Sequence, residues 1–173
     1  MKYIIAALLL CCAISASAQT EENYASSALY LEIAGNGGAI SANYEWRFLR
    51  DFSLRAGLGY FTDAEYVLIG TKQHYETVAR YLTIPVVINY LLPLGGKNNI
   101  QIGVGGTMFT GTSNTFALGS VPVGNSGIFP TASIGFRRQP KTEGFMIEAA
   151  LTPFYVGSKT IVYSAGLGFG YIF

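Results

Sequence analysis

The stretch GAISANYEWRF at residues 38–48 decides the fold class of this chain. Every second residue of it, from Ile40 to Phe48, is alanine, aliphatic or aromatic. The residues between them are small or polar and include Glu45 and Arg47. Because successive side chains of a strand point to opposite faces, this alternation predicts a β-strand with one apolar and one polar face.

The same alternation recurs along the chain and predicts an all-β protein. The segments that follow it are 28–35, 38–48, 52–61, 80–91, 99–110, 128–138, 144–155 and 160–173. Most are about ten residues long, the length that a tilted strand needs to cross a bilayer. An even number of such strands suits a closed antiparallel barrel. The sequence therefore predicts an eight-stranded antiparallel transmembrane β-barrel.

Short connections between these segments predict the strand register. Asn-Gly at 36–37, between two alternating runs, is the strongest two-residue hairpin signal and places Ile33 opposite Ile40. The next connection, read as a three-residue loop, places Glu45 opposite Arg55. Apolar side chains then face apolar ones, and opposite charges become neighbours that support a sheet.

Two connections are long, and we expect them to be loops, at 62–79 and 111–127. In an outer-membrane barrel, short turns face the periplasm and long loops face outside. His74, the only histidine, lies in the first of them. A histidine base needs an oriented nucleophile beside it, yet no serine occurs between Ser53 and Ser113. One histidine also makes a poor metal site, so we predict no catalytic residue, cofactor or metal.

Composition indicates which face meets lipid. Half of the 173 residues are hydrophobic and only 12% are charged, against roughly 25% in ordinary soluble domains. The 11 basic and 10 acidic residues leave no surplus for binding nucleic acid. A water-soluble barrel would turn its apolar face inward, but residues 98–136 carry no charge at all, which a sheet facing water could hardly tolerate. We therefore predict that the apolar face is outside and the polar face lines the lumen.

This assignment predicts two groups of functional side chains. The outward face should form an aromatic girdle at the membrane interfaces, from Tyr44, Trp46, Phe48, Tyr60, Tyr90, Tyr171 and Phe173. The inward face should hold a lumen charge network of Glu32, Glu45, Arg47, Arg55, Arg137 and Glu148. Eight strands leave space only for side chains or one small ligand, so we expect paired charges that plug the lumen, with a polar conduit as the alternative.

Residues 1–18 have the features of a cleaved secretory signal peptide. Lys2 precedes an apolar run at 3–13, and small residues follow at 15–18. Cys11 and Cys12 are the only cysteines and lie inside this segment, so we expect a mature chain without disulfides. A lipoprotein cysteine is the alternative, but Leu10, which precedes Cys11, is not the small residue that lipidation favours. A linker at 19–27 and a barrel domain at 28–173 complete the expected organisation.

The signal, the eight segments and the ending GFGYIF at 168–173 resemble small outer-membrane barrels of the OmpA/OmpX type, porin-family proteins of Gram-negative bacteria. In that family a C-terminal aromatic on an alternating last strand is the signal read by the barrel-assembly machinery. Phe173 matches that position, with Tyr171 and Phe169 at the alternating places before it. The resemblance implies export through the periplasm to the outer membrane, with its lipids and the assembly machinery as partners. No room remains after Phe173 for a peptidoglycan-binding domain, so that anchoring role is not expected.

The expected function is a structural or surface-interaction role without catalysis. An extracellular partner would bind through the loops at 62–79 and 111–127. The first alternative is a narrow pore or a conduit for hydrophobic solutes. The second is an outer-membrane lipid-modifying enzyme with His74 as its base.

Overall fold

The computed structural model describes most of the chain after the predicted signal peptide. The described residues are 24–69, 72–111, 117–118, 121–122, 126–156 and 160–173. Side chains are described outside 62–79 and 112–125. The predicted signal peptide at 1–18 and the first residues of the linker lie outside the described part. No helix within that part is long and apolar enough to span a membrane.

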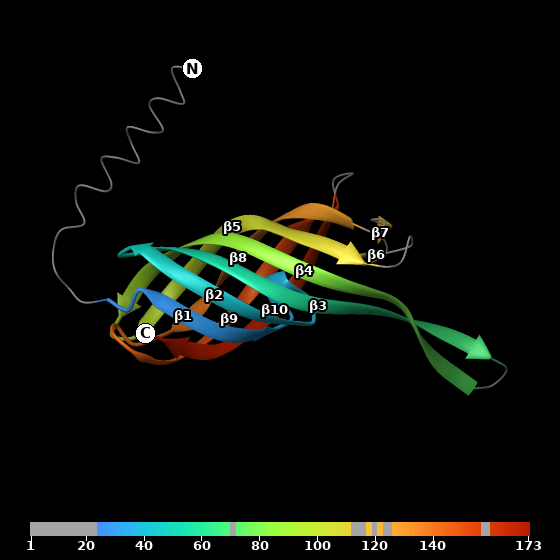
Figure 1. Cartoon of the computed structure of the whole chain (residues 1–173), viewed down its shortest axis with the longest axis horizontal. Coiled ribbons are helices and arrows are strands. Elements are labelled where there is room, and N and C mark those ends of the chain that lie inside the picture. Colours follow the sequence, from blue (N-terminus) through green and yellow to red (C-terminus); the bar gives the residue numbers. More distant parts are fainter. Residues whose placement is uncertain (1–23, 70–71, 112–116, 119–120, 123–125, 157–159) are drawn as a thin grey trace, which may run out of the picture.

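The chain forms one closed antiparallel barrel of eight strands, in the order β1-β10-β9-β8-β5-β4-β3-β2 (Figure 1). The strands are β1 (Ser27–Ile33), β2 (Ile40–Leu49), β3 (Phe52–Ile69), β4 (Lys72–Gly95), β5 (Asn98–Gly111), β8 (Ser126–Arg138), β9 (Gly144–Tyr155) and β10 (Ile161–Ile172). A separate pair, β6 (Ala117–Leu118) and β7 (Val121–Pro122), lies between β5 and β8. The predicted fold class, an all-β barrel of eight antiparallel strands, is confirmed.

Closure of the barrel joins the first strand to the last. β1 pairs with β10, and Ser27 and Phe173 exchange two backbone hydrogen bonds of 3.0 and 2.8 Å. Both ends of the described chain therefore lie at one rim, which we call the terminal rim. The connections β2–β3, β4–β5 and β8–β9 lie at the same rim, and the other connections lie at the opposite rim.

The predicted register is confirmed at the first two hairpins but not at β8–β9, where Phe136 faces Ala149 and not Phe145. The first turn also differs from the prediction. Ile33 faces Ile40 and Glu45 faces Arg55, as the turns indicated. Asn-Gly at 36–37, however, is not a two-residue hairpin loop. The ladder ends at the bond from Ala34 N to Ala39 O (2.9 Å), and Gly35–Gly37 form a buried 3₁₀ turn, η1. Positive φ angles at Gly35 (75°) and Gly38 (93°) turn the backbone away from the strand direction and into the lumen.

The first of the two predicted long loops is wrong. The stretch 62–79 is not a loop, because β3 and β4 stay paired until Ile69 meets Lys72. The resulting ribbon projects past the barrel in Figure 1. Strand formers such as Tyr66–Ile69 favour pairing, and polar residues are tolerated on a ribbon that lies beyond the barrel wall. The β4–β5 connection consists of Gly96 and Lys97, and positive φ angles at Gly95 and Gly96 allow this tight turn.

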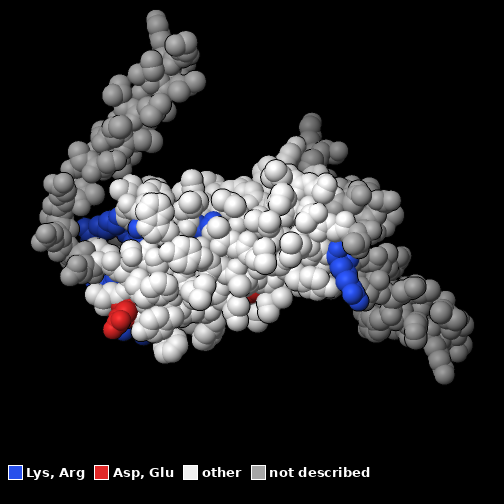
Figure 2. Space-filling view, in the orientation of Figure 1, with Lys and Arg blue, Asp and Glu red and all other residues white. Residues whose placement is uncertain are grey.

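The outer wall of the barrel is apolar, as predicted. Outward side chains include Phe145, 79% exposed, and Ile128, 72% exposed. Among the described outward strand residues, the charged ones are Arg80 and Arg138, and each lies near a rim. The wall between the rims is accordingly almost free of charge in Figure 2.

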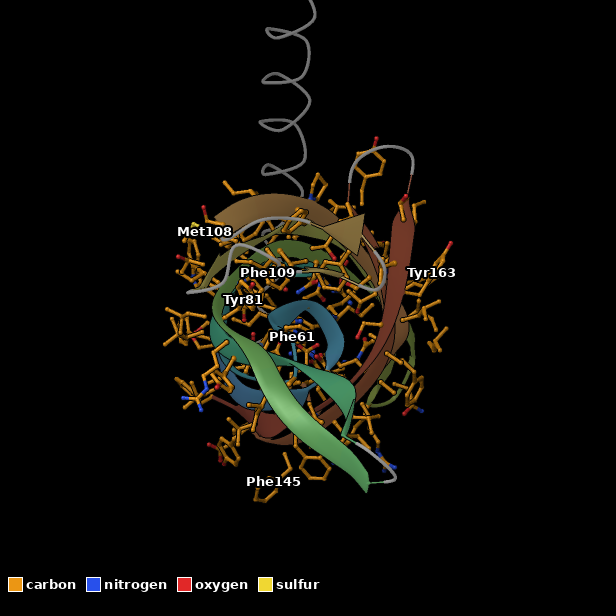
Figure 3. The ribbon with its side chains drawn as sticks, turned by 90° about the vertical axis from the view of Figure 1, so that its right-hand side faces the viewer. Phe61, Tyr81, Met108, Phe109, Phe145 and Tyr163 are labelled. Carbon is orange, nitrogen blue, oxygen red and sulfur yellow. The ribbon has the colours of Figure 1, made fainter. Side chains whose placement is uncertain are left out.

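The lumen is polar at its centre and apolar toward the opposite rim. Near the opposite rim, inward side chains form an aromatic cap of Tyr81, Phe109, Phe129, Phe154 and Val156. The Phe109 ring contacts the rings of Phe129 (5.3 Å between centroids) and Phe154 (6.2 Å), and Figure 3 shows Phe109, Tyr81 and Phe61 inside the ring of strands. The expectation that a polar face lines the lumen therefore holds at its centre but not near the opposite rim.

Candidate functional site

The centre of the lumen is built around Arg137 of β8. Its side chain is 1% exposed, and its Nη1 donates to both carboxylate oxygens of Glu45, at 2.7 and 2.8 Å, and to Gln101 Oε1 at 3.0 Å. Its Nη2 lies 3.1 Å from Met146 Sδ. These contacts reach β2, β5 and β9, so one side chain connects strands on different sides of the barrel.

A second buried ion pair joins Arg55 of β3 to Glu32 of β1. Arg55 Nε donates to Asn43 Oδ1 at 3.0 Å, and Ser41 Oγ donates to Glu32 Oε2 at 3.3 Å. Arg55 and Glu45 are cross-strand neighbours, but each has its short ion pair with another residue. The predicted neighbours thus belong to one network without being each other's closest partners.

Tyr30 of β1 joins the two ion pairs, and the sequence analysis missed it. Its ring centroid lies 5.4 Å from the guanidinium of Arg55 and 5.8 Å from that of Arg137. Its hydroxyl lies 3.5 Å from Glu45 Oε2. Cations over an aromatic face are attracted by the ring quadrupole, more so when water is excluded. Tyr30 has the same strand parity as Glu32, and that parity was the available signal for its inward position.

The remaining two predicted lumen charges differ from these. Glu148 is buried, its Oε2 lies 3.9 Å from Arg137 Nη1, and neither of its oxygens has a hydrogen-bond partner among the described residues. Arg47 lies at the terminal rim, with its guanidinium 5.9 Å from the Tyr24 ring, and lines a pocket there. Five of the six predicted charges therefore meet in the lumen, as two cations and three carboxylates, while Arg47 marks the mouth.

The buried turn η1 lies next to this network, on the side of the opposite rim, and fills the next layer of the lumen. Asn36 Nδ2 donates to Thr131 Oγ1 at 2.8 Å, and Thr107 Oγ1 donates to the Asn36 carbonyl at 2.9 Å. Gly35 N donates to Ser164 Oγ at 3.2 Å, and Thr83 Oγ1 donates to the Gly37 carbonyl. Side chains from four strands thus bind polar groups of the turn, whereas Asn36 Oδ1 has no hydrogen-bond partner among the described residues.

The lumen contents therefore form three layers along the barrel axis. The ion network lies nearest the terminal rim, η1 lies in the middle, and the aromatic cap closes the opposite end. No cluster of three or more His, Cys, Asp or Glu side chains in the described part could hold a metal ion. The backbone of His74 pairs with that of Val67 in the ribbon, and its side chain lies outside the described part.

The predicted girdle residues lie on the outer wall, mostly near the terminal rim. Rings follow one another there from Trp46 to Phe48 (5.9 Å), Phe52 (6.5 Å) and Tyr90 (4.9 Å). Tyr171 contacts Phe145 edge to face at 5.4 Å. Phe52 and Phe145 were not among the predicted set, although their strand parity places them there. Tyr60 lies toward the opposite rim, where it pairs with Ile40.

Comparison with known proteins relates this architecture to solved structures. No protein-family model and no curated protein sequence matches the chain. The crystal structure of the N-terminal β-barrel domain of Pseudomonas aeruginosa OprF is similar, with 15% identity, a TM-score of 0.57, and coverage of 88% of this chain and 98% of that one. The outer-membrane protein Ail of Yersinia pestis, solved in a phospholipid bilayer nanodisc, has 14% identity, a TM-score of 0.53, and coverage of 86% and 99%. The chain thus has the fold of the small eight-stranded outer-membrane β-barrels.

Proposed function

We propose that this chain is an integral β-barrel of the bacterial outer membrane with a structural or surface-interaction role, no catalysis, and a plugged lumen. The observation that carries this proposal is the inverted distribution of polarity. The wall exposes large apolar side chains, whereas Arg55, Arg137 and three carboxylates are buried inside. Monomeric proteins in water rarely expose a continuous apolar surface beyond a few hundred Å², so a hydrocarbon environment is the one that suits this wall.

The girdle and the last strand suit the same setting. Tyrosine and tryptophan rings favour membrane interfaces because one end is apolar and the other polar. Ser27 Oγ lies 2.9 Å from the Tyr44 hydroxyl at the terminal rim, so the polar end of this ring has a partner. We assign Phe169, Tyr171 and Phe173 as the assembly signal, because all three are exposed, two on β10, which closes the barrel, and Phe173 directly after it.

Surface interaction is assigned to the opposite rim. The β3–β4 ribbon and the β6–β7 segment both extend from that rim, away from the chain ends (Figure 1). In outer-membrane barrels the longer connections face outside, so an extracellular partner would bind at 62–79 and 111–127. Ail, whose fold is shared, is named for an attachment invasion locus, which supports a role at the cell surface.

Two measurements test this proposal. The chain folded in detergent should migrate differently in heated and unheated gel samples, and in intact cells a protease should cleave only at the opposite rim. A stable, monomeric preparation without detergent would refute membrane insertion. In planar bilayers the wild type should give no stepwise ion currents, since each lumen layer obstructs the axis. Regular unit conductance would instead support the narrow pore.

A further inference from the structure

The chain enters the buried turn η1 through a strained backbone conformation. Ala34, directly before η1, has φ 58° and ψ −150°. Among the described residues other than glycine, Ala34 alone has a positive φ angle. A β-carbon disfavours such angles, so holding Ala34 in this conformation costs free energy. Gly35 and Gly38 also have positive φ, but glycine adopts it without a steric penalty.

Neutral hydrogen bonds hold η1 in the lumen against this strain. The hydroxyl groups of Thr83, Thr107, Thr131 and Ser164 each bond to the turn. Exchange with water leaves such a bond only a modest net contribution to stability. Asn36 Oδ1 is buried without a hydrogen-bond partner among the described residues, which opposes the inward position. The inward course of η1 is therefore a balance between opposing terms of similar size.

An outward course is open to the same connection. β1 ends at Ile33, whereas β10 continues beyond their last pair, at Leu167, to Ile161. Continuation of this register would place Gly35 opposite Ala165, which pairs with β9 but with no described residue of β1. If the turn straightened, β1 could lengthen along β10. The Asn-Gly pair would then lie at the tip of a hairpin, a position that this pair strongly favours.

We propose that η1 is a latch, a turn that moves between an inward and an outward state. The inward state is the major one and closes the middle layer of the lumen. In the minor state the turn leaves the lumen and extends the β1–β2 hairpin at the opposite rim. Strain at Ala34 favours the outward state and the threonine contacts favour the inward one. Minor states of such two-state elements are populated at about 0.1–10%.

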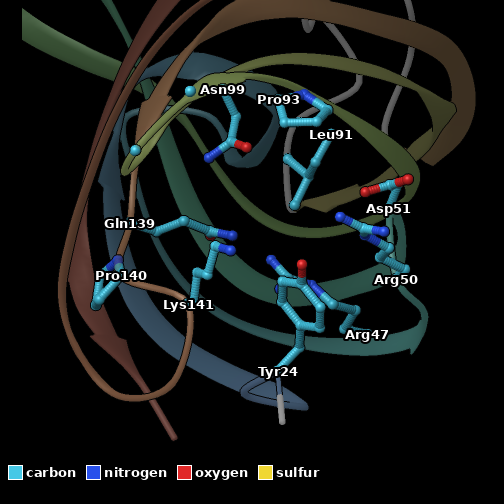
Figure 4. Close-up of a pocket in the computed structure, with 12 residues that line it drawn as sticks. Tyr24, Arg47, Arg50, Asp51, Leu91, Pro93, Asn99, Gln139, Pro140 and Lys141 are labelled. Carbon is cyan, nitrogen blue, oxygen red and sulfur yellow. The ribbon is translucent and has the colours of Figure 1, made fainter. Parts of the chain in front are cut away.

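Movement of the latch clears only one of the three lumen layers. The aromatic cap has its own ring contacts, and the ion network has its own ion pairs. The ion network also separates the middle layer from the pocket at the terminal rim, which Arg47 and Leu91 border (Figure 4). Release of the latch therefore loosens the centre of the lumen without opening a path for ions through the barrel.

The latch couples the lumen to the rim where we place surface interaction. A partner that binds the outward hairpin more tightly than the inward turn draws the equilibrium outward by that difference in affinity. This consequence rests on the proposed surface role, whereas the movement itself does not.

The test follows the turn by nuclear magnetic resonance in the whole mature chain, labelled with [¹⁵N]glycine and folded in detergent micelles. Relaxation dispersion at Gly35, Gly37 and Gly38 detects exchange with a minor state on the μs–ms timescale. We expect this exchange in the wild type, and none at Gly103, which lies within the paired part of β5. A water-soluble paramagnetic agent shows whether the minor state brings Gly37 to the solvent.

Three variants shift the equilibrium in different ways. T83V/T107V removes two hydroxyl groups that donate to carbonyls of η1, and it should raise the outward population about tenfold or more. A34G, alone or added to this pair, relieves the strain and should lower that population at least about threefold. S133A/T152V is the matched control, because it removes two buried hydroxyl groups that have no hydrogen-bond partner among the described residues. We expect it to change the population less than about twofold. Heated and unheated gel samples check that each variant folds.

Four results would overturn the latch. The first is the absence of exchange at the turn glycines in the folded wild type. The second is an equal rise in T83V/T107V and S133A/T152V, which would indicate general loosening of the lumen. The third is a population that A34G leaves unchanged. The fourth is a minor state in which Gly37 stays protected from the paramagnetic agent, since the turn would then rearrange inside the lumen. If T83V/T107V does not fold, the comparison of the wild type with A34G decides.

The measurement separates the latch from the proposed function. Exchange in micelles requires neither insertion into a membrane nor a surface partner. A rigid turn would therefore leave the outer-membrane barrel assignment intact, and failure to find a surface partner would leave the latch intact.

Discussion

Replacing Arg137 by methionine should destabilise the barrel strongly, because this side chain neutralises two buried carboxylates. Glu45 would lose both of its short contacts to Arg137 and keep Tyr30 and Asn89, each at 3.5 Å. Glu148 would lose the cation at 3.9 Å and has no described hydrogen bond to replace it. Removing one partner of a buried ion pair costs about 3–5 kcal/mol, mostly as the penalty for the charge that remains. We expect the free energy of unfolding of Arg137→Met to fall by about that amount.

The assay is urea unfolding in lipid vesicles, followed by gel mobility and Trp46 fluorescence. Arg138→Gln is the matched control, because it removes the adjacent arginine from the exposed outer wall, and we expect a change within about 0.5 kcal/mol. In the double variant Glu45→Gln/Arg137→Met the loss should be smaller than the sum of the single losses, since one stranded charge is gone. A loss below about 1 kcal/mol for Arg137→Met would mean that water solvates these carboxylates, and it would refute the dry, plugged lumen.

Further predictions concern the turn, the glycines and the last strand. Asn36→Ala removes the donor to Thr131 and should cost about 1–3 kcal/mol in the same unfolding assay; an unchanged stability would show that η1 is not fixed by this contact. In Gly59→Val the added β-carbon would collide with the Gly37 carbonyl, so we expect about 1–3 kcal/mol of destabilisation, whereas at outward Gly106 the nearest atom lies at 3.4 Å and valine should be nearly neutral. Equal effects at the two glycines would contradict the buried turn. Phe173→Ala should lower the amount of folded barrel in the outer membrane of cells while the purified chain still folds in detergent; normal amounts in cells would remove Phe173 from the assembly signal.

Strand parity predicted the barrel because it is a local property of the sequence. The alternation that places Glu45 and Arg47 on one face needs only neighbouring residues, and short connections then set Ile33 opposite Ile40. Strand parity also predicts that Phe61 points inward, because Phe61 shares a face of β3 with Arg55. Near the closed end of the lumen its ring packs against the aromatic cap.

Strand parity could not predict which charged side chains pair with each other inside the lumen. Arg137 and Glu45 are 92 positions apart and lie on strands that are not neighbours in the sheet. Their contact follows from closure of the barrel and from the reach of the arginine side chain across it. Likewise, Asn36-Gly37 suits both a tight hairpin and a turn that folds inward, and only the hydroxyl groups of Thr107 and Thr131 on distant strands select the second.

The three lumen layers predict that stability and conductance respond separately to substitution. Loss of Arg137 disturbs the ion network, but η1 is held by β4, β5, β8 and β10, and the aromatic cap by its own ring contacts. The single variant Arg137→Met should therefore unfold more easily and still carry no stepwise current in a planar bilayer. Onset of regular unit currents in this variant would mean that the ion network alone closes the axis, because η1 and the cap would then leave a path for ions. Such a result would contradict the obstruction of the lumen by η1 and the aromatic cap. It would favour a gated pore in the wild type.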